Sequence, residues 1–210
     1  MGDSLFFLLK KYTFAKRKKY TKMINLSEEN FNLEWGTFAS NVGSLGLNLP
    51  LDELKEAFKE APGALSEDTG IAYPGALLVH INLANSIADR LQKMVSGTFK
   101  IDEASRLKVC MLMHLSKIEM YTPNSSAYWV KNGKPYEFNP NLEAPYLKFG
   151  DRSIILAMKY GITFTPTEYD AMKCLENEEK KGSTILSTII RQANELAYAI
   201  EKERYNKNKN

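Results

Sequence analysis

Apolar residues recur every three or four positions along most of this chain, the spacing of one buried face on an α-helix. This period predicts a first helix after an N-cap at Ser27 and a second helix beginning at Pro50. A third helix is expected over about residues 77–94. His80 lies on the apolar face of that helix, so we expect its side chain to point inward.

The segment from Val109 to Tyr121 begins as an apolar run and turns polar from His114 onward. A helix starting near Asp102 is expected to continue through it. A buried helix that ends in a histidine is one place for a metal or a catalytic group. It is equally an ordinary place for a core helix to reach the surface.

After Tyr121 the helical period is lost. Residues 128–130 and 136–138 flank Asn132-Gly133, the dipeptide expected in a tight β-hairpin, and Pro135 restricts that ribbon to an edge position. We therefore expect a small two-stranded flap. Its aromatic side chains suit either stacking on a base or a partner, or packing on the domain.

Three more helices are expected in the second half of the chain. The first covers residues 150–160, and the second starts at an N-cap on Thr165 and runs to about Glu176. The last covers about residues 183–205. The predicted fold is all-α: a helical bundle with a small β-hairpin flap.

Composition is consistent with one globular domain over residues 23–205, preceded by a basic extension at residues 1–22 and followed by a polar tail at residues 206–210. The net charge is only +3, but the extension holds seven Lys or Arg and one Asp. This extension is either a surface that binds phosphate, lipid or nucleic acid, or a solvated segment.

Cysteine usage and hydropathy favour a cytoplasmic protein. Cys110 and Cys174 have no metal-binding spacing and are expected to be reduced, buried side chains. No window approaches 18 consecutive apolar residues, so no transmembrane segment is expected. The apolar residues 5–9 precede their positive charges, the wrong order for a secretory signal.

Five segments, listed in order, carry a resemblance to the HD-domain phosphohydrolases: residues 74–80, 110–121, 145–153, 165–175 and 190–201. The resemblance covers about residues 70–203. It implies an all-helical domain whose His and Asp side chains surround one or two divalent metals, and these metals activate a water that cleaves a phosphoester.

The residues at the family's ligand positions differ from those of active members. His80 matches the first histidine, but the His-Asp pair is Met113-His114 here, and the His that opens the next motif is Phe149. A later His is replaced by Leu175, and the last Asp by Asn194. These positions form the expected vestigial pocket: His80, Met113, His114, Phe149, Leu175 and Asn194.

The chemistry of these replacements argues against hydrolysis. Met113, Phe149 and Leu175 cannot give a divalent metal the charged oxygen ligands that it needs. We therefore expect no catalytic residue and no metal site. Lys117 and Arg152 are candidate phosphate-binding cations, although a lysine at a helix end also complements the helix dipole, and residues 151–153 also suit a helix cap.

Two functions follow from these observations. The preferred one is a catalytically degenerate HD-fold protein that acts by binding. It would be either a nucleotide sensor or a structural or assembly component with a protein partner or a second copy, for example a phage accessory or virion protein in the virion or host cytoplasm. The alternative is a divergent phosphohydrolase that holds Mn, Fe, Mg, Ni or Zn with His80, His114, Asn194 and a carboxylate from Asp151 or Glu119.

Overall fold

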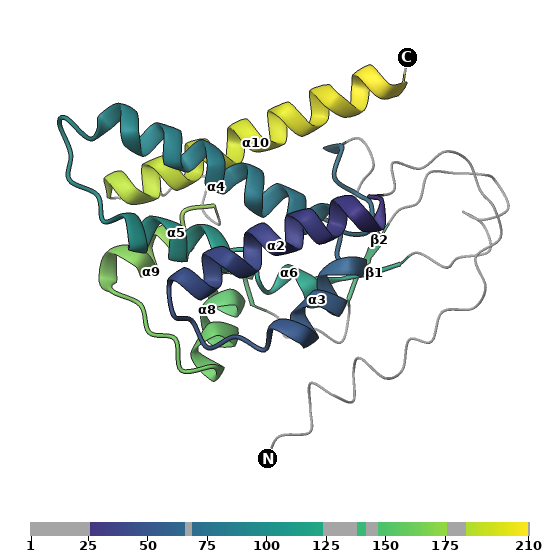
Figure 1. Ribbon diagram of the computed structural model, residues 1–210, viewed down its shortest axis with the longest axis horizontal. Helices are drawn as coiled ribbons and strands as arrows, with labels where there is room; N and C mark the ends of the chain where they lie inside the picture. The colour runs from purple at the N-terminus through teal and green to yellow at the C-terminus, as the bar shows by residue number, and fades with distance from the viewer. Residues whose placement is uncertain (1–25, 66–68, 124–137, 142–146, 176–183, 210) are drawn as a thin grey trace, which may run out of the picture.

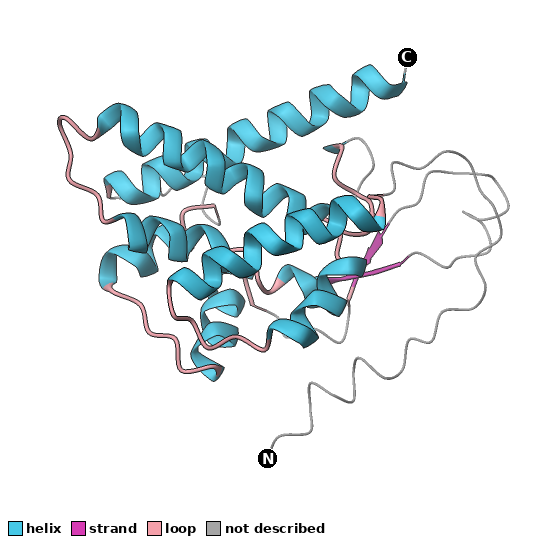
Figure 2. Cartoon of the chain, in the orientation of Figure 1, coloured by secondary structure: helices cyan, strands magenta, loops and turns pink. Residues whose placement is uncertain are grey.

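A computed structural model describes residues 26–65, 69–123, 138–141, 147–175 and 184–209. The fold is mainly helical, which confirms the predicted all-α class (Figure 2). No helix in these ranges is long and apolar enough to cross a membrane. The helices are α2 (Glu28–Ser44), α3 (Leu51–Glu60), α4 (Ala76–Val95), α5 (Glu103–Leu112), α6 (Lys117–Met120), α8 (Phe149–Lys159), α9 (Pro166–Met172) and α10 (Ile185–Lys209).

Helix α4 is the centre of the packing. It contacts α2, α5 and α10, and Figure 1 shows α10 crossing it at an angle. Burying the apolar faces of these helices supplies most of the driving force for folding. Large side chains that are fully buried include Phe38 of α2, Phe58 of α3, Leu77 and Ile81 of α4, Met111 of α5 and Ile190 of α10.

The predicted helix starts agree with the structure at two caps. The Ser27 hydroxyl accepts a hydrogen bond from the Asn30 backbone N–H, and Thr165 forms a reciprocal capping box with Glu168. Both caps satisfy backbone N–H groups that the first helical turn leaves without partners. His80 is fully buried, as its place on the apolar face predicts.

The helix expected to continue to Tyr121 is interrupted, so that prediction was wrong. Helix α5 ends at Leu112, residues 113–116 form turns, and the short helix α6 follows. Ser153 of α8 stabilises this break: its hydroxyl donates to the Met113 carbonyl at 3.0 Å and accepts from the Ser116 N–H at 3.0 Å. The Met113 carbonyl and the Ser116 N–H, which lose helical partners at the break, thereby have hydrogen-bond partners inside the core.

Two other boundaries also differ from the predictions. Helix α9 ends at Met172 and not near Glu176, because residues 173–175 already form a turn. Helix α10 continues to Lys209, beyond the expected end near Tyr205 and into the segment expected to be a polar tail. Apolar periodicity fades before the helix does, since its last turns have no core to cover.

The two described strands are not the segments expected for the flap, apart from Phe138, which lies opposite Pro123; the expected strand at 128–130 lies outside the described residues. Strands β1 (Tyr121–Pro123) and β2 (Phe138–Pro140) pair antiparallel, with Thr122 opposite Asn139. The predicted turn at Asn132-Gly133 and the basic extension at residues 1–22 both lie outside the described residues.

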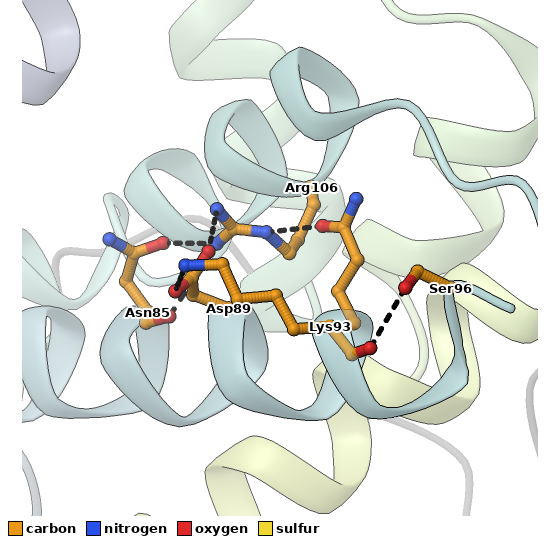
Figure 3. A network of polar contacts seen from close by, with 6 residues as sticks. Asn85, Asp89, Lys93, Ser96 and Arg106 are labelled. Atoms are coloured by element: carbon orange, nitrogen blue, oxygen red, sulfur yellow. Dashed lines mark hydrogen bonds and ion pairs between the residues drawn. The ribbon is translucent and has the colours of Figure 1, made fainter.

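A buried arginine joins α4 to α5 (Figure 3). Arg106 of α5 donates to Gln92 Oε1 and Asn85 Oδ1, each at 2.6 Å, and its Nη2 lies 3.4 Å from an Asp89 oxygen. Asp89 also pairs with Lys93 at 2.7 Å. Because a buried guanidinium is costly unless its donors are satisfied, this network fixes how the two helices pack.

Replacing Glu168 by glutamine is expected to lower the free energy of unfolding by about 1 kcal/mol at neutral pH. Burial opposes ionisation of this carboxyl, but hydrogen bonds from Thr165, Lys108 and Ser105 outweigh it and lower its pKa. A carboxyl with a lowered pKa stabilises the fold at neutral pH and loses that effect in acid. Measured by urea unfolding, the difference in unfolding free energy between the variant and the unmodified protein should therefore become smaller below about pH 4. Glu103→Gln, at an exposed site in the first turn of α5, should show no such gap.

Candidate functional site

The two histidines of the chain meet at one buried asparagine. His80 comes from the second turn of α4, His114 from the turn after α5, and Asn194 from α10. Their ring Nε2 atoms lie 3.2 Å and 2.7 Å, respectively, from the Asn194 Oδ1 atom. All three side chains are at most 1% exposed, so these hydrogen bonds lie inside the core and take the place of bonds to water.

The orientation of Asn194 fixes the direction of these hydrogen bonds. Its amide nitrogen donates to the Ile190 carbonyl at 2.8 Å and approaches the Met113 sulfur at 3.4 Å. The amide oxygen must therefore face the histidines and accept from them. Asn194 thus holds both imidazole rings with an uncharged acceptor.

His80 is also held by a carboxylate. Its Nδ1 atom lies 2.8 Å from Glu201 Oε2, and the Glu201 side chain is only 5% exposed. The carbonyl of Glu201 lies against Gly70, where an added Cβ would come within 2.8 Å of it. Gly70 also has a positive φ of 80°, which favours glycine, so the segment before α4 can pack tightly on α10.

Each apolar replacement predicted at the vestigial pocket lies close to this cluster. Met113 contacts Asn194, and the Phe149 ring stacks on His114 with centroids 5.8 Å apart. Leu175 lines the same cavity as His114 and Asn194. The structure therefore brings together all six residues predicted for the vestigial pocket. The apolar side chains among them fill part of the space between the two histidines and Asn194.

Lys117 places a buried ammonium group beside this cluster. It is 7% exposed, and its ammonium donates to the Gly63 carbonyl at 3.2 Å and the Tyr198 hydroxyl at 2.9 Å. It also lies near the faces of the Phe149 and Tyr198 rings. Burial lowers its pKa, and no carboxylate among the described residues forms an ion pair with it. A buried ammonium with only neutral partners is energetically costly.

A cavity of about 430 Å³ adjoins Lys117. Apolar side chains in its wall are Phe149, Cys174 and Leu175. Polar side chains in its wall are His114, Lys117, Arg191, Asn194, Glu195 and Tyr198. Glu195 is exposed, so the cavity reaches the surface beside α10. Its volume is within the range of small-molecule sites, and polar side chains make up most of its wall.

Two residues of the cavity wall each have a buried atom without a hydrogen-bond partner within the described ranges: His114 Nδ1 and Arg191 Nε. Burial, Lys117 and His80 all lower the pKa of His114, which keeps the ring neutral near pH 7. Both atoms are closed to solvent, so each carries an unmet hydrogen-bonding requirement inside the protein. Such unsatisfied groups are uncommon in protein cores.

The remaining candidates lie outside this cavity wall. Arg152, a predicted phosphate-binding residue, is buried and lies 3.7 Å from Glu119 in an ion pair. Asp151 pairs with Lys173 at 2.9 Å. Glu119 and Asp151, the two carboxylates considered as metal ligands, thus each form an ion pair with a basic side chain. Among the described residues no group of three or more His, Cys, Asp or Glu could hold a metal ion, so this donor set does not fit a hydrolytic metal.

Sequence reasoning missed three residues of α10: Arg191, Tyr198 and Glu201. The spacing of two of them could have revealed their place. Tyr198 and Glu201 follow Asn194 by four and seven residues, so all three lie on one face of the helix. In a helix rich in Lys, Glu and Asn, those polar residues resembled a solvated surface. Recognising Asn194 as buried would have placed the other two beside it.

The fold and this site define a mainly helical protein with a buried polar cluster beside a surface-connected cavity. No family model, characterised protein or solved structure matches the chain.

Proposed function

We propose that this protein binds a phosphate-bearing small molecule, such as a nucleotide, in the cavity beside Lys117 and does not hydrolyse it. In this proposal the chain is a catalytically degenerate member of the HD-domain phosphohydrolases that has become a sensor. The observation that carries the proposal is the buried ammonium of Lys117, which faces a cavity without a carboxylate partner among the described residues. An anion would offset the cost of keeping that charge out of water.

The composition of the cavity wall supports a phosphate ligand. Arg191 adds a second cationic side chain to the wall that contains Lys117. Loss of ligating groups at Met113, Phe149 and Leu175 supports binding without turnover. The divergent-hydrolase alternative would need carboxylates that instead pair with Arg152 and Lys173.

Isothermal titration calorimetry with inorganic phosphate and with nucleoside mono-, di- and triphosphates tests the proposal. We expect saturable binding of at least one phosphate compound, weaker binding of its parent nucleoside, and no dependence on added Mn²⁺ or Zn²⁺. Phosphate release should stay at the background rate. Failure of every phosphate compound to bind would refute the proposal, and metal-dependent turnover that stops in His80→Ala would establish the hydrolase alternative.

A further inference from the structure

One face of α10 supplies four of the residues that line the cavity. Arg191, Asn194, Glu195 and Tyr198 recur at helical spacing, which places them on the same side of the helix. Lys117, the first residue of α6, also lines the cavity. The cavity therefore lies along α10, and the charges on this helix face act on whatever the cavity holds.

Three of the described side chains in the wall are charged at neutral pH. Lys117 and Arg191 are positive, and Glu195 is negative. Burial lowers the pKa of His114 and raises the pKa of Tyr198, so these two wall residues stay uncharged. The described part of the wall therefore combines two positive charges with one negative charge.

These charges lie at different depths. Lys117 is 7% exposed, Arg191 is half-buried and Glu195 is exposed. The inner part of the cavity is therefore positive, whereas its opening carries a carboxylate. Charges in a partly buried site are screened less than charges on an open surface, so this carboxylate acts on a ligand even where it does not touch it.

This arrangement distinguishes phosphate compounds by the charge on their outer part. A ligand whose single phosphoryl group lies beside Lys117 keeps its negative charge in the inner part of the cavity. A diphosphate or triphosphate bound in the same direction extends further negative charge towards Glu195. The carboxylate repels that charge, and the repulsion offsets part of the attraction to the two cations.

We infer that the cavity selects phosphate compounds with a single phosphoryl group over diphosphates and triphosphates, because Glu195 repels further negative charge at the opening. Glu195 is thus a specificity-determining residue that acts without holding the phosphate itself. The inference rests on the proposed function and adds to it the number of phosphoryl groups that the ligand carries.

Calorimetric titration with a nucleoside monophosphate and with the triphosphate of the same nucleoside, both without divalent cations, tests this selection. Attraction to Lys117 and Arg191 alone would favour the triphosphate, which carries more negative charge. We expect the monophosphate to bind at least about threefold more tightly, and this preference should decrease as salt is added. A triphosphate that binds as tightly as the monophosphate would overturn the inference and leave the proposed function standing. Failure of every phosphate compound to bind would remove both.

The variant Glu195→Gln tests whether Glu195 is the selecting residue. Glu195 is exposed and accepts a hydrogen bond from Gln192 at 3.3 Å, which a glutamine carbonyl also accepts, so the variant should fold. We expect it to bind the triphosphate about threefold to tenfold more tightly than the unmodified protein does, with a smaller gain for the monophosphate. Glu203→Gln removes the same charge from an exposed site further along α10 and should leave the preference unchanged. If the preference also persists in Glu195→Gln, the size of the cavity and not Glu195 excludes the triphosphate, and the inference is wrong.

Discussion

Replacing Glu201 by alanine is expected to lower the free energy of unfolding by about 3 to 5 kcal/mol. Glu201 is the carboxylate partner of His80, and both side chains are almost completely buried. Without it, His80 Nδ1 would have no acceptor in a core from which water is excluded. Chemical denaturation monitored by circular dichroism measures this change directly.

Glu203→Ala is the matched control, because it makes the same substitution on the same helix. Glu203 is largely exposed and pairs only with Lys207, one turn further along. Its loss should cost less than about 0.5 kcal/mol. Similar costs for the two variants would mean that the contact between Glu201 and His80 contributes little to stability.

Replacing Lys117 by methionine is expected to weaken phosphate binding by about tenfold to a hundredfold. The substitution keeps the length of the side chain and removes its charge and its N–H groups. Calorimetric titration with the best-binding phosphate compound measures the loss. Lys93→Met, which removes an exposed lysine on α4, should leave the affinity unchanged. Unchanged binding in the Lys117 variant would exclude this lysine from the site.

The stability of the Lys117→Met variant should depend on pH in a defined direction. Burial lowers the pKa of Lys117, so between that pKa and about 10.4 the unfolded chain binds more protons than the folded one. The lysine therefore destabilises the fold at neutral pH, and this penalty is relieved as the pH rises through that window. Relative to the unmodified protein, the variant should lose stability as the pH approaches about 10, which denaturation at several pH values would reveal.

Local signals in the sequence predicted much of the helical framework. Ser27, Thr165 and Pro166 each mark a helix start through chemistry that acts within one turn, so no knowledge of the rest of the chain was needed. The inward direction of His80 followed from its place on an apolar face. The prediction that Asn194 belongs with the two histidines came from the family resemblance and not from any local pattern.

Features that depend on distant partners could not be predicted in this way. The break after Leu112 is stabilised by Ser153, which lies on another helix. No glycine or proline near the break predicts it from the sequence. Arg191 and Glu201 belong to the site because α10 packs on α4, a fact of the tertiary structure. The partners of Arg152 and Asp151 likewise became known only once the helices were placed.

The distance in sequence between the cluster residues has a consequence for biosynthesis. Asn194 lies 114 residues after His80 and 80 after His114, and it contributes the oxygen that joins them. A nascent chain that has not yet released α10 from the ribosome lacks this oxygen and four of the nine residues that line the cavity. The buried cluster can therefore form only after translation has passed the last helix, so any ligand that depends on this cluster would stabilise the finished fold and not its early intermediates.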